Sequence, residues 1–198
     1  MGSTTIWSWV DRERTDLADQ LEALSADQWV VNSLCDGWTV RDVAAHLTHS
    51  QLAAPQMMAA MLGSGFRFNT MMRRLVSADD RRPDQLVAAL RSAAGSRRRP
   101  PGTTPADPLM DVLVHGQDIA IPLGIDRPMP GPAACVVAEH LWRMRFPMNP
   151  RRHLKGVRLV ATDADFAVGD GQPVTAPIRD LVLVLSGRRR LSAGAAPA

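Results

Sequence analysis

The spacing of the hydrophobic side chains changes at Gly156 of this 198-residue chain. Before that glycine, apolar residues recur at helical spacing, as in residues 6–24, where charged residues occupy the opposite face. After it, apolar residues occupy every second position from Val157 to Ala161, which is typical of a strand. The chain therefore predicts a helical body followed by a small segment that contains strands.

Proline, glycine and capping residues divide this pattern into separate elements. The predicted helices cover residues 5–24, 40–63 with a pause near Pro55, 66–76, 83 onward, 107–124 and 132–145. Short strands within residues 157–175 are expected to form a small antiparallel sheet, on which a helix over residues 177–186 packs. The predicted domains are a helical bundle over residues 1–148, a small α+β subdomain over residues 149–190 and a disordered tail over residues 191–198.

Composition excludes two classes of protein. No stretch reaches about eighteen uncharged apolar residues, and the first 24 residues carry several charges, so neither a membrane span nor a secretory signal is predicted. We expect a cytoplasmic protein without a membrane partner.

The two cysteines, Cys35 and Cys135, lack a Cys-x-x-Cys partner, which argues against a disulfide framework or a thiolate zinc site. Each is predicted to be a small buried hydrophobe.

The basic balance of the chain does not predict a nucleic-acid partner. The net charge is +3, and the excess comes from arginine clusters at residues 97–99, 151–152 and 188–190. These clusters lie beside prolines or near the chain end, which is typical of solvated loops, and no known nucleic-acid-binding motif organises them. We expect an anionic small molecule to be the more suitable partner for arginines near a pocket.

Three residues form a candidate metal site. Asp111 and His115 are four positions apart, so on a helix they share one face and can bind one cation from the same side. His46, on a different predicted helix, is the candidate third ligand. Two histidines and a carboxylate leave a coordination position open, as in catalytic zinc sites. The alternative is a buried hydrogen-bond network without metal.

The segment before His46 has its own local pattern. Thr39 and Asp42 form a capping box that starts a helix at Val40 and places His46 in its second turn. Asp42 has a second interpretation, in which it orients the His46 imidazole. His49, one turn after His46, is a spare candidate ligand.

Two runs resemble a known family. They are Leu-Cys-Asp-Gly-Trp-Thr-Val-Arg-Asp-Val-Ala-Ala-His-Leu, which ends at Leu47, and Asp-Val-Leu-Val-His-Gly-Gln-Asp-Ile-Ala-Ile-Pro-Leu-Gly, which begins at Asp111. Over roughly residues 5–190 the chain is similar to the mycothiol-dependent maleylpyruvate isomerase family, within the DinB/YfiT-like group of four-helix proteins. This resemblance implies a mainly α fold, a DinB-like up-down four-helix bundle with a small α+β C-terminal appendage. It also implies metal ligation by His46, Asp111 and His115, where Asp111 replaces the family's glutamate.

The predicted function combines a divalent metal, zinc in the first place, with an external thiol. Coordination would keep a thiol deprotonated at neutral pH, and a thiolate can add to a small electrophilic substrate. No cysteine of the chain is positioned as that nucleophile, so the resemblance implies mycothiol. The protein is then an isomerase or S-transferase with small-molecule partners, and a homodimer is compatible with the sequence.

The segment 67–74 supplies candidate contacts for the thiol or an anionic substrate. Arg67, Asn69 and Arg73 are the candidates, and the alternative is a polar helix face. Two other classes of function remain open. One is a non-catalytic metal- or small-molecule-binding helical protein, and the other is a metal-free helical interaction module.

Overall fold

The computed structural model describes residues 2–52, 54–100, 102–146 and 148–191, and the chain divides into two compact units, residues 1–127 and 128–198. The first unit contains α1 (Ser3–Glu22), α2 (Ala26–Trp29), α3 (Val40–His49), α4 (Ala54–Gly63), α5 (Phe68–Ser77), α6 (Pro83–Ser92) and α7 (Ala106–Ala120). The second contains α8 (Gly131–Arg143), α9 (Pro150–His153), β1 (Val157–Ala161), β2 (Ala167–Val168), β3 (Gln172–Ala176) and α10 (Ile178–Leu185). The prediction of a mainly α fold with a small α+β part is confirmed.

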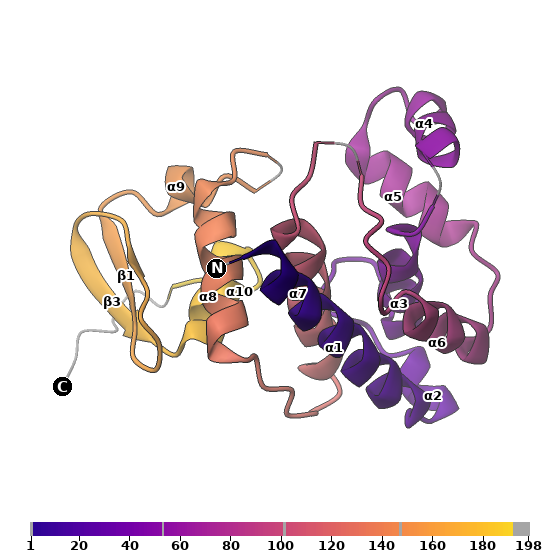
Figure 1. The fold of residues 1–198 in the computed structure, drawn as a ribbon, viewed down its shortest axis with the longest axis horizontal. Helices are drawn as coiled ribbons and strands as arrows, with labels where there is room; N and C mark the ends of the chain where they lie inside the picture. The colour runs from indigo at the N-terminus through magenta and orange to yellow at the C-terminus, as the bar shows by residue number, and fades with distance from the viewer. Residues whose placement is uncertain (1, 53, 101, 147, 192–198) are drawn as a thin grey trace. The chain divides into compact units, whose positions relative to one another are not determined.

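Four helices of the first unit form a bundle (Figure 1). Helix α1 packs against α6 and α7, and α3 packs against the same two helices. Their apolar stripes meet in one core, in which Leu17, Val43, Leu90 and Val112 are almost fully buried. Burial of an aliphatic side chain contributes about 1.5–3 kcal/mol, so this shared core holds α3 and α7 beside one another.

The N-terminus of α3 is fixed by the predicted capping box. The backbone N–H of Thr39 donates to Asp42 Oδ2 at 2.9 Å, and the Asp42 N–H donates to Thr39 Oγ1 at 3.3 Å. Asp42 is therefore a capping residue rather than the partner of His46. The helix ends at His49 instead of continuing as an α-helix through residue 52. The backbone N–H groups of Gln51 and Leu52 donate to carbonyls three residues back, which is a tighter turn than that of an α-helix.

Gly116 lets a buried arginine cross α7. A Cβ at this position would lie 2.7 Å from Nε of Arg127, whose guanidinium continues to Glu13 Oε2 on α1 at 2.8 Å. The Arg127 and Glu13 side chains are only 7% and 4% exposed. A helix-interior glycine therefore joins α7 to α1 through an ion pair that any larger residue would displace.

Gly116→Ala is expected to destabilise the protein by about 1–3 kcal/mol, because overpacking against a buried side chain outweighs the higher helix propensity of alanine. Urea unfolding measures the change. Gly63→Ala is the matched control, since its added Cβ meets no atom within 4 Å. Equal stability of Gly116→Ala and the parent protein would contradict this account.

A second buried charged group joins α3 to the α5–α6 loop. Asp79 Oδ2 lies 3.0 Å from His49 Nε2, and the Arg81 guanidinium donates to both oxygens of Asp79. The hydrogen bond from Arg81 outweighs burial and, with the contribution of His49, holds the pKa of Asp79 well below its usual value. Burial lowers the pKa of His49 despite the neighbouring carboxylate.

Asp79→Asn is expected to cost about 1–3 kcal/mol at neutral pH, because it weakens hydrogen bonds to a buried charged group. Since the folded-state pKa of Asp79 is depressed, its contribution is present above the unfolded value of about 4 and is lost as the pH falls through the folded value. Urea unfolding at decreasing pH should therefore show the gap to the parent protein narrowing below about pH 4. Asp19→Asn, in an exposed pair with Arg91, is the control; a gap that widens in acid would refute the assignment.

The second unit contains a three-stranded sheet with the order β2-β1-β3. The predicted strands are present, but the prediction of an antiparallel sheet is wrong for one pair: β1 pairs antiparallel with β2 and parallel with β3. The chain crosses the start of β1 at Gly169 and Gly171, where an added Cβ would lie 2.3 and 2.2 Å from the backbone oxygens of Val157 and Gly156. Two glycines with positive φ therefore let β3 return on the other side of β1.

Helix α8 belongs to this second unit, because it packs against α10. The division at residues 127/128 thus precedes the predicted one after residue 148. Of the predicted tail, residues 192–198 lie outside the described residues.

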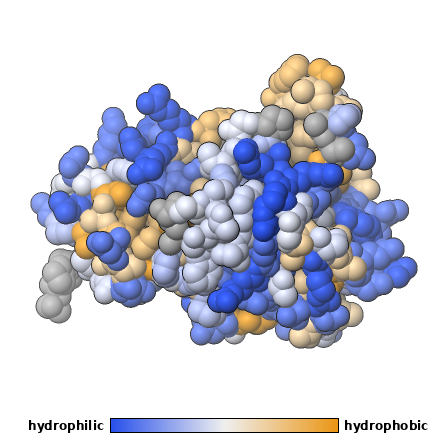
Figure 2. All heavy atoms as spheres, in the orientation of Figure 1, coloured by the Kyte–Doolittle hydropathy of each residue, from blue (hydrophilic) through white to orange (hydrophobic). Residues whose placement is uncertain are grey.

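The surface of the first unit carries an apolar area over α4. Figure 2 shows it as an orange area, and Met58 and Leu62 are each 58% exposed.

Among the described residues, none of the helices combines the length and the hydropathy that crossing a bilayer requires.

Candidate metal site

The packing of α3 against α7 brings His46, Asp111 and His115 together. Nε2 of His46 lies 3.5 Å from Asp111 Oδ1, and Nε2 of His115 lies 3.4 Å from the same oxygen. The two imidazole rings meet edge to face with centroids 4.7 Å apart. One carboxylate oxygen thus lies between two imidazole nitrogens that come from different helices.

These separations fit a small divalent cation. Ligand atoms about 2.0–2.1 Å from a tetrahedral zinc ion lie about 3.3 Å from one another. All three candidate ligand atoms lie within 4.8 Å of one another, and the side chains of the two histidines are 14% and 13% exposed. Although aspartate is one methylene shorter than glutamate, the Asp111 carboxylate still reaches the space between both imidazoles. Metal binding by these residues remains a prediction.

The charge of Asp111 favours a cation. Burial would raise its pKa, but the hydrogen bond and charge of His46, together with the charges of His115 and Arg14, leave the pKa below its usual value. The carboxylate is therefore ionised at neutral pH. A negatively charged oxygen beside two imidazoles is a suitable donor set for zinc.

The loop before α3 explains the Gly-Trp-Thr-Val-Arg-Asp motif. Gly37 has a positive φ of 74° and turns the chain, and the Trp38 ring packs on His46 with centroids 5.2 Å apart. The same loop is attached to α7, because the Leu34 N–H donates to the backbone oxygen of Asp118 at 3.0 Å. The motif therefore positions His46 and also reaches the helix that carries the other two residues.

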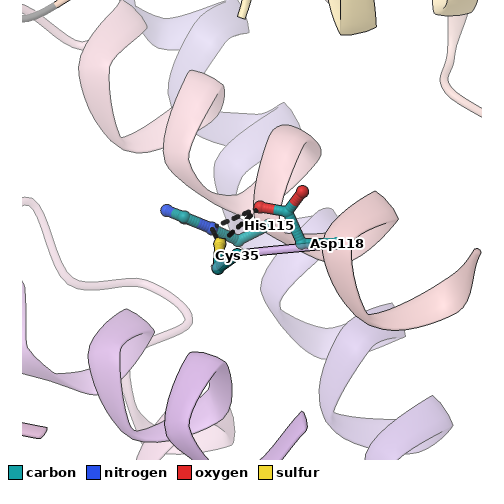
Figure 3. A group of neighbouring side chains, drawn as sticks. All are labelled: Cys35, His115 and Asp118. Carbon is teal, nitrogen blue, oxygen red and sulfur yellow. Dashed lines mark hydrogen bonds and ion pairs between the residues drawn. The ribbon is translucent and has the colours of Figure 1, made fainter. Parts of the chain in front are cut away.

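This attachment brings together a group that the sequence reasoning missed (Figure 3). Nδ1 of His115 lies 2.8 Å from Asp118 Oδ2, and the thiol of Cys35 donates to the same oxygen at 3.0 Å. The spacing of three residues between His115 and Asp118 was the available signal, since such residues share a helix face. Cys35 is half-buried and hydrogen-bonded, not merely a small hydrophobe as predicted.

The other candidate residues lie apart from this group. His49 bonds to Asp79 instead of joining the triad. Arg67 and Asn69 are exposed at the start of α5 and Arg73 is exposed in its middle, while the opposite face of the helix is buried. A polar helix face accounts for their positions, and a role in binding a thiol or substrate stays a prediction.

A cavity of about 740 Å³ in this unit, lined by Asp79 and Arg81 among others, includes no member of the triad.

Fold and site together define a helical bundle with a histidine–carboxylate group between two of its helices. A sequence model of the family described as mycothiol maleylpyruvate isomerase N-terminal domain matches residues 10–108, and the chain belongs to this family. The matched region contains His46 and ends before Asp111.

Two solved structures have a similar fold. A crystal structure of the mycothiol-dependent maleylpyruvate isomerase is 16% identical, with a TM-score of 0.61, and a mutant of it with one histidine replaced by alanine is 15% identical, with a TM-score of 0.64. Both alignments cover 96% of this chain and 90% of the other. None of the curated proteins matches this chain.

Protein purified without chelator is expected to carry about one zinc ion per chain, because the triad supplies three ligands of the appropriate type. His46→Ala and His115→Ala should each reduce this stoichiometry close to zero in elemental analysis. His153→Ala, at an exposed position of the second unit, is the matched control and should retain the metal. Parent protein that takes up no divalent metal, or full retention by both triad variants, would contradict the assignment.

Proposed function

We propose that this protein is a zinc- and mycothiol-dependent isomerase or S-transferase that acts on a small electrophilic substrate. The observation that carries the proposal is the convergence of His46 and His115 on one oxygen of Asp111. Membership of the mycothiol maleylpyruvate isomerase family supports the thiol. A cytoplasmic location and a homodimer stay predictions.

The chain's own cysteines are unsuited to be the reacting sulfur. The Cys35 thiol is already engaged, since it donates a hydrogen bond to Asp118 Oδ2 at 3.0 Å. Burial and the nearby charges of Glu139, Asp163 and Asp165 raise the pKa of Cys135. We therefore assign the reacting sulfur to an external thiol, as family membership supports.

The triad would hold the cation and leave a coordination position for that thiol. A bound zinc ion supplies the stabilisation that keeps a thiol deprotonated at neutral pH. Asp111 provides a negative charge, while the two imidazoles hold the site from opposite helices. Partial exposure of Asp111, with 28% of its side chain accessible, leaves the site open toward solvent.

The reaction on the substrate then follows from thiolate chemistry. The sulfur adds to one carbon of an electrophilic double bond, and the electron pair of that bond moves onto the electron-withdrawing group. The former double bond can now rotate, and expulsion of the thiolate restores it with the opposite geometry. This sequence is an isomerisation, and it regenerates the thiol. If the enolate instead takes up a proton from solvent, the sulfur remains bonded to the substrate, and the outcome is S-transfer.

The expected activity requires both metal and thiol. Zinc-loaded protein with mycothiol should isomerise a small cis-unsaturated keto acid, with maleylpyruvate the first compound to assay because of the family. Asp111→Asn should lower the rate by about 100-fold or more, since it removes the anionic ligand. His153→Ala is the control, and ultraviolet absorbance of the substrate follows the reaction.

A second assay separates isomerase from S-transferase. A small alkylating electrophile is added with mycothiol, and the loss of free thiol is measured. Metal and mycothiol binding without turnover in either assay would replace the proposal by a non-catalytic binding protein. Absence of both metal and mycothiol binding would leave the metal-free interaction module.

A further inference from the structure

The two ring nitrogens of His115 face two different groups. Nε2 faces Asp111 Oδ1 at 3.4 Å, and Nδ1 lies 2.8 Å from Asp118 Oδ2. The side chain of Asp118 is completely buried, at 0% exposure. One imidazole therefore connects the candidate cation site to a carboxylate inside the bundle.

Oxygen Oδ2 of Asp118 is the acceptor for two neighbours. The Cys35 thiol donates to it at 3.0 Å, and Nδ1 of His115 lies at hydrogen-bond distance from it. An ionised carboxylate oxygen can only accept, so with Asp118 ionised the nitrogen opposite it carries a proton. A neutral imidazole has only one N–H. If Nδ1 holds it, the lone pair of Nε2 points toward His46 and Asp111.

We propose that Asp118 is a positioning residue that holds His115 in the Nδ1–H tautomer, with Nε2 ready to bind a cation, and that the Cys35 thiol is the second donor to this carboxylate. The proposal deepens the proposed function and rests on it for the cation. A carboxylate behind a ligating histidine fixes the ring orientation and makes the other nitrogen more basic.

Within the described part of the chain, the His46 ring lacks a corresponding hydrogen bond at Nδ1. Nδ1 of His46 is buried and has no hydrogen-bond partner among the described residues. The Trp38 ring packs against the His46 ring and restricts it by contact alone. His115 is thus the imidazole whose tautomer a hydrogen bond sets.

Cys35, His115 and Asp118 also satisfy the distance criterion for a metal group, since their ligand atoms lie within 4.8 Å of one another. A cation there would have to displace the hydrogen bonds at 2.8 and 3.0 Å and remove the thiol proton. Around Asp111, by contrast, the nitrogen–oxygen separations of 3.4 and 3.5 Å are already those of ligands around a cation. His115 therefore directs Nε2, not Nδ1, to the cation.

The first test reads the tautomer in the metal-free protein, so it does not depend on the proposed function. Long-range ¹H–¹⁵N NMR is recorded at about pH 8, above the ordinary histidine pKa of about 6.5. The expected spectrum shows a protonated Nδ1 and an unprotonated Nε2 for His115, identified by loss of its signals in His115→Ala. A protonated Nε2 in the parent protein would overturn the proposal even if zinc binds.

The second test measures zinc affinity by competition with a chelator. Asp118→Ala should lower the affinity by about 10–100-fold and shift His115 toward the Nε2–H tautomer. Cys35→Ser is the conservative variant, because its hydroxyl can still donate to Asp118, and its affinity should stay near that of the parent. Unchanged affinity in folded Asp118→Ala would refute the positioning role. If Asp118→Ala fails to fold, the tautomer of the parent protein decides.

Cobalt substitution distinguishes the two overlapping metal groups. Cobalt bound at His46, Asp111 and His115 should show no sulfur-to-metal charge-transfer band in the near ultraviolet. A band that disappears in Cys35→Ser would place the ion at Cys35 and overturn the inference. If the parent protein binds no metal, the proposed function is refuted. The His115 tautomer measured in the metal-free protein then still decides whether Asp118 positions the ring.

Discussion

The position of one carboxylate oxygen governs the rest of this site. Oδ1 of Asp111 lies between the imidazoles of His46 and His115, at 3.5 and 3.4 Å, and it carries negative charge at neutral pH. These separations are long for hydrogen bonds but ordinary between ligands of one cation, so they suit a shared cation better than a hydrogen-bond network. The register of α3 against α7 sets these distances. The contacts that fix the register of α3 against α7 therefore also determine the geometry of the site.

Several buried contacts hold α7 in place. On one face, Gly116 allows Arg127 to cross the helix and reach Glu13 on α1. On another, the backbone and side chain of Asp118 bind the loop that precedes α3. Both contacts lie within three residues of His115. The part of α7 around His115 would form a poor helix by propensity alone. These contacts with α1 and with the loop before α3 stabilise it at the place where the candidate ligands must be held rigidly.

The sequence predicted those parts of the structure that depend on local chemistry. The capping box at Thr39 and Asp42 required only the preference of a helix terminus for these residues, and it is present. The pairing of Asp111 with His115 required only helical spacing. In contrast, the role of Gly116 depends on an arginine eleven residues later and a glutamate on α1, so no local pattern indicates it. The parallel pairing of β1 with β3 likewise depends on how closely Gly169 and Gly171 pass the start of β1. The contact between Cys35 and Asp118 joins residues that are 83 positions apart, so no local pattern indicates it either.

Crystallography of zinc-soaked protein, with data collected on both sides of the zinc absorption edge, tests the central claim most directly. The account predicts one anomalous peak per chain, about 2.0–2.2 Å from Nε2 of His46, Nε2 of His115 and a carboxylate oxygen of Asp111. A peak bonded to the Cys35 sulfur, or a soaked crystal with no anomalous peak at either group, would contradict it.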